Sequence, residues 1–275
     1  MTSPHWDESR ADAYRRFQFE FPERPLAGAA IALAGGSGGL GAATAALLIR
    51  EGANLIIGYR SNRDRAENLR NALTADSNVK IELVGGDLSV PEVRRAYLAA
   101  AEKLGPPLSG LVVFAGDPAR VPAESLDRDA MLASLDVNYV GPVLLARDLG
   151  AAMEPSPRGG RVVLLSTMQS TSVFPGSLNY APPKAALQHA ACILAQQWSN
   201  VSVNVVAPGA TISGMAAASV QSGKYDQQIA SGAVSRFGRP EDVARAVRFF
   251  LEPDNYVTGQ TLTVDGGLTL RRHRR

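Results

Sequence analysis

Short runs of apolar residues alternate along this chain with longer segments in which apolar positions recur every three or four residues. The runs are nearly continuous in Val, Ile, Leu and Ala, which is typical of strands that are buried on both faces. They predict seven strands, at residues 29–34, 55–59, 79–84, 111–114, 162–165, 201–206 and 261–264.

The segments between these runs have helical periodicity and predict helices at residues 39–49, 64–75, 91–104, 128–153 and 180–198. Strands that alternate with helices form a parallel sheet whose two faces are both covered. We therefore expect an α/β protein with a doubly wound (Rossmann-type), mostly parallel seven-stranded sheet, in a single catalytic domain over residues 28–270. Ligands of such sheets bind at the carboxyl ends of the strands.

Three segments do not follow this pattern. Residues 1–27 form an N-terminal arm, which is either a short amphipathic helix packed on the body or a mobile extension. Residues 212–236 interrupt the rhythm beside the strand ends, as a substrate lid or a plain surface excursion. Residues 271–275 form a basic tail, which we expect to be solvated rather than bound to nucleic acid.

Composition excludes several classes of protein. The net charge of +2 indicates no polyanionic partner, and no apolar run reaches the length of a membrane span. Cys192 is the only cysteine and the three histidines are scattered, so we expect neither a disulfide nor a metal site. The sequence predicts a cytoplasmic protein with no nucleic-acid or membrane partner.

A glycine-rich turn lies between the first strand and the first helix. Glycines there allow a tight turn and let the backbone approach a pyrophosphate at the helix N-terminus. A glycine loop without a ligand is the alternative. The candidate cofactor-binding residues of this turn are Gly35, Ser37, Gly38, Gly39, Leu40 and Gly41.

The end of the second strand reads Tyr59-Arg60-Ser61 and has no carboxylate. An acidic residue there would bind the ribose 2′-hydroxyl of NAD, whereas Arg60 suits the 2′-phosphate of NADP. We therefore expect NADP(H) as cofactor. In the alternative, Arg60 and Arg63 merely begin a solvated helix.

Tyr180 and Lys184 are four residues apart, which places both on one face of a helix. A positive charge near a phenol lowers its pKa by favouring the phenolate. The pair therefore suits a proton donor and the group that adjusts its pKa, although such pairs are common on helix surfaces.

Together, the glycine turn and the Tyr180–Lys184 pair resemble the classical short-chain dehydrogenase/reductase family over residues 28–268. Further landmarks agree in order and spacing. Asn138 and Thr167 match the family's active-site asparagine and catalytic serine. The other matching positions, on the cofactor side, are Asp87, Leu88, Ala115, Gly116, Pro208, Gly209 and Ser213.

The resemblance implies hydride transfer between a nicotinamide and a carbonyl or alcohol carbon. It assigns Tyr180 as proton donor and Thr167 as second donor to the carbonyl oxygen. Lys184, together with the oxidised nicotinamide, would lower the pKa of Tyr180. Tyr180 and Lys184 would both bind the cofactor, Lys184 at the nicotinamide ribose, and Asn138 would connect Lys184 to solvent through water. The departures from the family pattern include Val113-Phe114 in place of two asparagines and the pair Pro182-Pro183 inside the Tyr-Lys motif.

The C-terminal motifs most resemble bacterial 3-oxoacyl-acyl-carrier-protein reductases. We therefore expect an NADPH-dependent reductase of a small-molecule or carrier-bound carbonyl substrate, and the family implies a homotetramer. The alternatives are an alcohol, sugar or steroid dehydrogenase on the same scaffold and a non-catalytic NADP(H)-binding protein.

Overall fold

The computed structural model describes residues 16, 22–75, 77–213, 220–223 and 225–271. The expected N-terminal arm lies outside the described residues apart from residues 16 and 22–27, and so does the basic tail after Arg271. Near the start of the described chain, Leu26 is buried and its N–H donates to the carbonyl of Glu51 at 3.2 Å.

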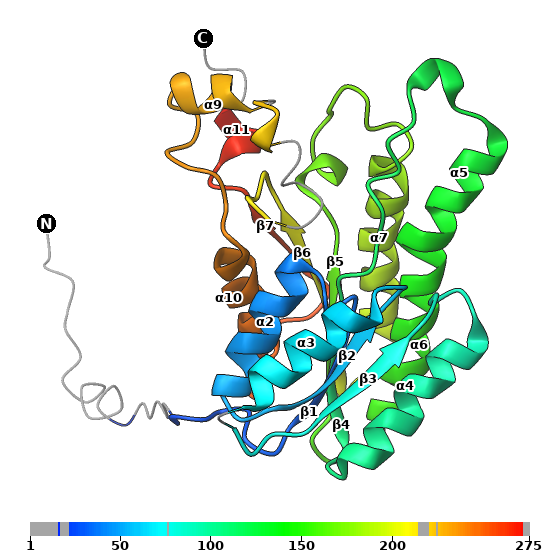
Figure 1. The fold of residues 1–275 in the computed structure, drawn as a ribbon, viewed down its shortest axis with the longest axis vertical. Coiled ribbons are helices and arrows are strands. Elements are labelled where there is room, and N and C mark those ends of the chain that lie inside the picture. The colour runs from blue at the N-terminus through cyan, green and yellow to red at the C-terminus, as the bar shows by residue number, and fades with distance from the viewer. Residues whose placement is uncertain (1–15, 17–21, 76, 214–219, 224, 272–275) are drawn as a thin grey trace, which may run out of the picture.

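Seven strands in the described chain form one sheet in the order β3-β2-β1-β4-β5-β6-β7, and every pairing is parallel (Figure 1). This confirms the doubly wound sheet. The order reverses between β1 and β4, and the carboxyl ends of these strands diverge there to leave a crevice. The strands are β1 (Ala30–Ala34), β2 (Asn54–Tyr59), β3 (Ile81–Gly85), β4 (Leu108–Val113), β5 (Gly160–Leu165), β6 (Val201–Pro208) and β7 (Thr261–Val264).

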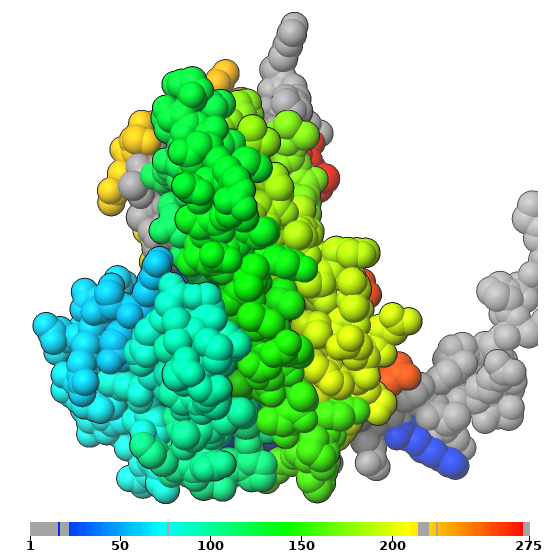
Figure 2. Space-filling model, turned by 90° about the vertical axis from the view of Figure 1, so that its right-hand side faces the viewer, coloured from blue at the N-terminus to red at the C-terminus, as the bar shows by residue number. Residues whose placement is uncertain are grey.

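Helices cover both faces of the sheet. One layer holds α2 (Gly39–Arg50), α3 (Arg63–Thr74) and α10 (Pro240–Phe250), and the other holds α4 (Pro91–Leu104), α6 (Gly141–Met153) and α7 (Ala181–Gln197). Figure 2 shows the second layer from outside, with α4 in teal, α6 in green and α7 in yellow-green.

Side chains of each strand alternate between these two layers. In β1, Ala30, Ala32 and Ala34 join the core under α4, α6 and α7, while Ile31 and Leu33 join the core under α2 and α10. Because β1 is buried on both faces, its sequence is apolar throughout.

The sequence predicts one continuous helix over residues 128–153, and this prediction is wrong because the segment is interrupted. It consists of α5 (Arg128–Leu135), a π-helical turn η2 (Asp136–Val140) and α6. Pro142 has no N–H to donate to the carbonyl of Asn138, and its ring crowds that carbonyl. In the wider turn the N–H of Gly141 donates to the carbonyl of Asp136, so Asn138 sits at a break in the helix.

Helix α10 was not among the predicted helices. Pro240 is its first residue, and Glu241 and Asp242 lie in its first turn, where acidic side chains are favoured. Arg236 donates to Asp242 at 2.6 Å. Val247 is buried in the core on the face of the sheet that α2 covers.

The remaining elements are short. They are η1 (Ala123–Ser125), η3 (Met168–Ser170), α9 (Asp226–Ala230) and α11 (Leu268–Arg271). Within the expected lid, residues 214–219 and 224 lie outside the described residues, so the lid stays a prediction. None of the described helices has the length and apolar character that crossing a membrane requires.

Candidate active site

A cavity of about 660 Å³ opens at the carboxyl ends of β1, β4, β5 and β6, where the strand order reverses. Of the site residues expected from the sequence, all but Ser61 and Asn138 line it. Segments more than 170 residues apart in sequence, from Gly35 to Ser213, therefore meet in one cavity, as the parallel topology requires.

The glycine turn has the shape and the donors that a pyrophosphate needs. Gly35 has φ of +78°, and a Cβ there would lie 2.9 Å from the Ala115 nitrogen. A Cβ at Gly41 would lie 2.6 Å from the Gly36 Cα. No side chain caps the first turn of α2, so its N–H groups remain donors beside the cavity. The residues present thus fit a dinucleotide phosphate.

The end of β2 carries an ion pair. The Arg60 guanidinium lies 3.4 Å from the Asp87 carboxylate, and both side chains line the cavity. Hydrogen bonds from Ser89 lower the pKa of Asp87, with a smaller contribution from Arg60. Ser61 is exposed and does not line the cavity, because the chain turns away into α3 after Arg60.

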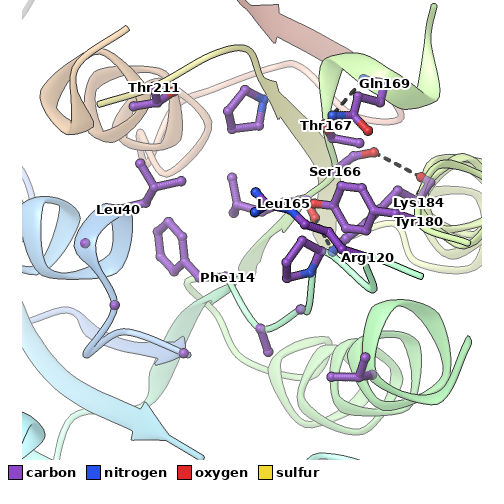
Figure 3. A pocket seen from close by; sticks show the side chains of 18 of the residues that line it. Leu40, Phe114, Arg120, Leu165, Ser166, Thr167, Gln169, Tyr180, Lys184 and Thr211 are labelled. Carbon is purple, nitrogen blue, oxygen red and sulfur yellow. Dashed lines mark hydrogen bonds between the residues drawn. The ribbon is translucent and has the colours of Figure 1, made fainter. Parts of the chain in front are cut away.

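Tyr180, Lys184 and Thr167 meet at the end of β5 (Figure 3). Tyr180 is the N-cap of α7, and Lys184 lies one turn later. The hydroxyls of Tyr180 and Thr167 are hydrogen-bonded. Lys184 is 2% exposed, and its Nζ donates to the carbonyl of Leu165 at 2.9 Å. Ser166 Oγ donates to the carbonyl of Lys184 at 3.0 Å, which ties α7 to the strand end.

The two prolines of the Tyr-Lys motif are compatible with this geometry. Pro182 and Pro183 are the second and third residues of α7, where backbone N–H groups have no intrahelical partner. The helix therefore begins beside Tyr180, as the sequence predicts.

Burial dominates the titration of both groups. It raises the pKa of Tyr180 to about 12, to which the charge of Asp117 adds, while the hydrogen bond with Thr167 acts in the lowering direction. It lowers the pKa of Lys184 to about 7, so the ammonium carries only part of a charge at neutral pH. In the chain without its cofactor, burial therefore outweighs any lowering of the pKa of Tyr180 by Lys184. The expected lowering also involves the charge of the oxidised nicotinamide, so it stays a prediction. Any lowering has to come from a positive charge bound beside the phenol.

Asn138 is buried and holds the segment after β4. Its Oδ1 accepts from the Asp117 nitrogen at 3.0 Å, and its Nδ2 donates to the Asp117 carbonyl at 2.9 Å. A Cβ at Gly116 would lie 2.9 Å from Asn138 Oδ1 and 3.0 Å from Lys184 Nζ, so glycine at this position leaves room for both side chains. The Asn138 side chain is thus occupied in fixing the backbone of Asp117.

Replacing Asp117 with asparagine is expected to shift the pH profile of carbonyl reduction. The reaction needs a protonated phenol, so its rate falls as pH rises through the pKa of Tyr180. Without the Asp117 charge that pKa is lower, so the alkaline limb of kcat moves to lower pH. Asparagine keeps the oxygen that accepts from Ala119 N.

The exposed Asp129→Asn on α5 is the control, and its profile should stay unchanged. An Asp117→Asn limb at the wild-type pH would remove Asp117 from this role.

An apolar wall faces Tyr180. Phe114, directly after β4, and Leu40, in the first turn of α2, point into the cavity (Figure 3). The backbone nitrogens of Phe114 and Ala115 donate to the carbonyl of Ala34, at 2.8 and 3.1 Å. Main-chain bonds therefore attach β4 to the glycine turn where the family pattern has asparagine side chains.

Several lining residues were not predicted from the sequence. Thr211 is buried next to the expected Ser213, and its Oγ1 donates to the carbonyl of Gly209 at 3.1 Å. Arg120 extends into the cavity from the segment after β4 (Figure 3). Its signal in the sequence was its place just after a strand end, which alone did not distinguish it from other surface arginines.

Known proteins share this sequence and fold. A family model described as Enoyl-(Acyl carrier protein) reductase matches residues 34–269. The 3-oxoacyl-acyl-carrier-protein reductase of Rickettsia felis is 30% identical, over 89% of this chain and 98% of that protein. The glucose 1-dehydrogenase of Gluconobacter oxydans is 28% identical, over 89% and 93%.

Among solved structures, a short-chain type dehydrogenase/reductase from Mycobacterium ulcerans has a TM-score of 0.83 at 27% identity, over 90% of this chain and 91% of that chain. Agreement in sequence extends over almost the whole sheet and includes the segments that line the cavity. The chain belongs to the classical short-chain dehydrogenase/reductase family of oxidoreductases, which bind a nicotinamide cofactor.

Proposed function

We propose that this protein is an NADPH-dependent reductase that transfers a hydride to a carbonyl substrate, a 3-oxoacyl thioester or a similar ketone. The observation that carries the proposal is the Tyr180 phenol, hydrogen-bonded to Thr167 beside the buried Lys184, in a cavity whose other end is the glycine turn. The similarity to a 3-oxoacyl-acyl-carrier-protein reductase supports the substrate class.

Each catalytic residue has a distinct part in this reaction. Tyr180 donates its proton to the carbonyl oxygen, since a pKa above neutrality keeps the phenol protonated. The Thr167 hydroxyl donates a second hydrogen bond to the same oxygen. Lys184 holds the cofactor ribose, and Asn138 fixes the Asp117 backbone. The bound nicotinamide supplies the hydride.

The remaining assigned residues hold the cofactor. The turn from Gly35 to Gly41 takes the pyrophosphate, and Asp87 and Leu88 take the adenine. Ala115, Gly116, Pro208, Gly209 and Ser213 surround the nicotinamide half. Tyr59 and Arg60 border the adenosine ribose. Arg60 takes the 2′-phosphate, because its guanidinium lines the cavity and the end of β2 has no carboxylate that would repel the phosphate.

The test is oxidation of NADPH and NADH with acetoacetyl thioesters, β-keto esters, quinones and sugars. We expect kcat/KM with NADPH to exceed that with NADH at least about tenfold, and Arg60→Gln to remove roughly 10- to 100-fold of the NADPH value, as loss of a charge-assisted pair does. Equal use of both cofactors would contradict the NADPH assignment.

Gly38→Arg provides the opposite change. Gly38 has φ of −75°, and a Cβ there meets only the Gly35 carbonyl at 3.4 Å, so a side chain fits. We expect this variant to raise the preference for NADPH. Cofactor binding without reduction of any carbonyl would instead favour a non-catalytic NADP(H)-binding protein.

We also infer a homotetramer. The exposed apolar side chains Met131 and Leu132 on α5 and Ile193 on α7 support an interface on this layer of helices. A monomer mass by light scattering at micromolar concentration would contradict it. The cytoplasmic location stays a prediction.

A further inference from the structure

A second phenol, that of Tyr97 on α4, lies at the cavity without a hydrogen-bond partner. Tyr97 is 2% exposed and belongs to the core under α4, α6 and α7, yet it also lines the cavity. None of the described residues forms a hydrogen bond with its hydroxyl. Because a buried hydroxyl that lacks a partner lowers stability, we looked for a partner among the groups that the cavity would hold.

The Tyr97 hydroxyl lies where β1 and β2 end. A Cβ at Gly58, in β2, would overlap this hydroxyl and would lie 3.1 Å from the Cα of Ala34 in β1. Ala34 and Gly58 directly precede Gly35 and Tyr59, which both line the cavity. The hydroxyl is therefore at the floor of the cavity, in a space that exists because β2 has glycine at this position.

This floor belongs to the part of the cavity assigned to the adenosine side of the cofactor. The N–H of Ser37 donates to the carbonyl of Gly58 at 3.4 Å, so the glycine turn assigned to the pyrophosphate adjoins the residue beside the hydroxyl. Arg60, assigned to the 2′-phosphate, follows Gly58 by two residues. The proton donor Tyr180 lies at the end of β5, which β4 separates from β1. A ligand that contacts Tyr97 is therefore the cofactor and not the carbonyl substrate.

A buried ion pair holds α4 in place. Arg94, one turn before Tyr97, is 7% exposed, and its Nε donates to Asp148 on α6 at 2.9 Å. Its Nη1 donates to the carbonyls of Leu88 and Ser89, at 2.8 and 3.0 Å. These contacts attach the first half of α4 to α6 and to the segment assigned to the adenine. The helix thus holds the Tyr97 hydroxyl in position before a cofactor binds.

The charge state of Tyr97 suits contact with a nucleotide. Burial raises the pKa of Tyr97 above its usual value, so the phenol is neutral and protonated at neutral pH. A protonated phenol can donate one hydrogen bond and can also accept. The ribose and phosphate oxygens of a nucleotide are acceptors for such a donor.

We propose that Tyr97 is a cofactor-binding residue, whose hydroxyl forms a hydrogen bond with the adenosine 5′-phosphate portion of the nicotinamide cofactor; this rests on the cofactor placement in the proposed function. That portion is common to NADPH and NADH. Tyr97 therefore adds affinity for both cofactors, whereas Arg60 is assigned to the 2′-phosphate, which NADPH alone carries.

The experiment compares Tyr97→Phe with the wild type in the binding of four nucleotides. The variant keeps the ring in the core and removes only the hydroxyl. We expect the Kd values for NADPH, NADH and ADP to rise roughly three- to tenfold, as the loss of one hydrogen bond does. The Kd for NMN⁺, which lacks the adenosine half, should change less than about twofold. Fluorescence titration measures the two reduced cofactors, and calorimetry measures ADP and NMN⁺.

The melting temperature separates cofactor binding from a structural role. No described residue is hydrogen-bonded to the hydroxyl, so cofactor-free Tyr97→Phe should melt at the wild-type temperature or above it. A fixed concentration of NADPH should raise the melting temperature of the variant less than that of the wild type, because its affinity is lower. A cofactor-free variant that melts well below the wild type would mean that the hydroxyl stabilises the fold, and it would overturn the proposal.

Tyr139→Phe is the matched control. Tyr139 is a partly buried tyrosine that packs against the same core and does not line the cavity, so the four Kd values should stay at those of the wild type.

Two results in the binding measurements would contradict the proposal. Unchanged Kd values in Tyr97→Phe would mean that water alone satisfies the hydroxyl. A rise in Kd for NADPH without one for NADH would place the contact at the 2′-phosphate. None of these measurements depends on turnover, so a protein that reduces no ketone would defeat the reductase function and leave this test intact.

Discussion

Replacing Tyr180 with phenylalanine is expected to lower kcat for carbonyl reduction by at least about 100-fold, the scale of a general acid. The variant keeps the ring that fills the N-terminus of α7 and removes only the hydroxyl, which binds Thr167. The backbone nitrogen of Lys184 still donates to the carbonyl of residue 180, and Lys184 Nζ still donates to Leu165. We therefore expect the Kd for NADPH, measured by fluorescence titration, to stay within about twofold, since the contacts assigned to the pyrophosphate, the adenine and the 2′-phosphate do not involve the phenol.

Two measurements make this result specific. Tyr256→Phe removes a phenol that is fully exposed, and it should leave kcat unchanged. Single-turnover reduction separates the chemical step from product release, and the loss in Tyr180→Phe should appear in that step. A variant that reduces the ketone at a rate near that of the wild type would exclude Tyr180 as the proton donor.

The raised pKa of Tyr180 bears on the direction of the reaction. A phenol that the protein's own groups keep protonated is ready to donate to a carbonyl oxygen, whereas alcohol oxidation needs the phenolate. Burial and Asp117 both act against the phenolate, and Lys184, itself desolvated, offsets little of this at neutral pH. A protonated phenol is the form that the proposed reduction requires.

The sheet could be predicted from the sequence because parallel strands buried on both faces are apolar at every position, as in β1. The order of the landmarks then predicted which residues meet, since carboxyl ends of parallel strands share one edge. The break at Asn138 was also readable in principle, because Pro142 follows it by four residues. Helix α10 was missed although Pro240 and the acids after it mark a helix N-terminus.

Side-chain direction and electrostatics were beyond the sequence. Arg120 lines the cavity after a segment whose backbone is held by Asn138, Asp117 and Asn179, and the sequence does not show these contacts. The pKa of Tyr180 depends on how much water surrounds it, which the spacing to Lys184 does not show. The sequence motifs thus identified Tyr180 and Lys184, whereas their burial in the folded protein determines their pKa values.

The glycine turn provides the second large effect. Gly41→Ala is expected to raise the Kd for NADPH at least about tenfold and to lower the free energy of unfolding by roughly 1–3 kcal/mol, because a new methyl group would overlap backbone atoms. The Cβ would lie 2.6 Å from Gly36 Cα and 2.7 Å from its carbonyl oxygen, and neither atom can rotate away. To relieve this overlap, the first turn of α2 has to move away from Gly36 at the end of β1. This movement displaces the N–H donors beside the cavity.

Gly38→Ala is the matched control, three residues earlier in the same turn. Its Cβ meets only the Gly35 carbonyl at 3.4 Å, and its φ of −75° suits any residue, so Kd and stability should stay close to wild type. Fluorescence titration with NADPH and denaturant unfolding measure the two quantities. Equal effects of the two alanines would mean that loss of glycine flexibility, rather than the approach of Gly41 to Gly36, governs the turn. No effect of Gly41→Ala would mean that α2 can shift without disturbing the phosphate donors, and the turn would lose its assigned part in cofactor binding.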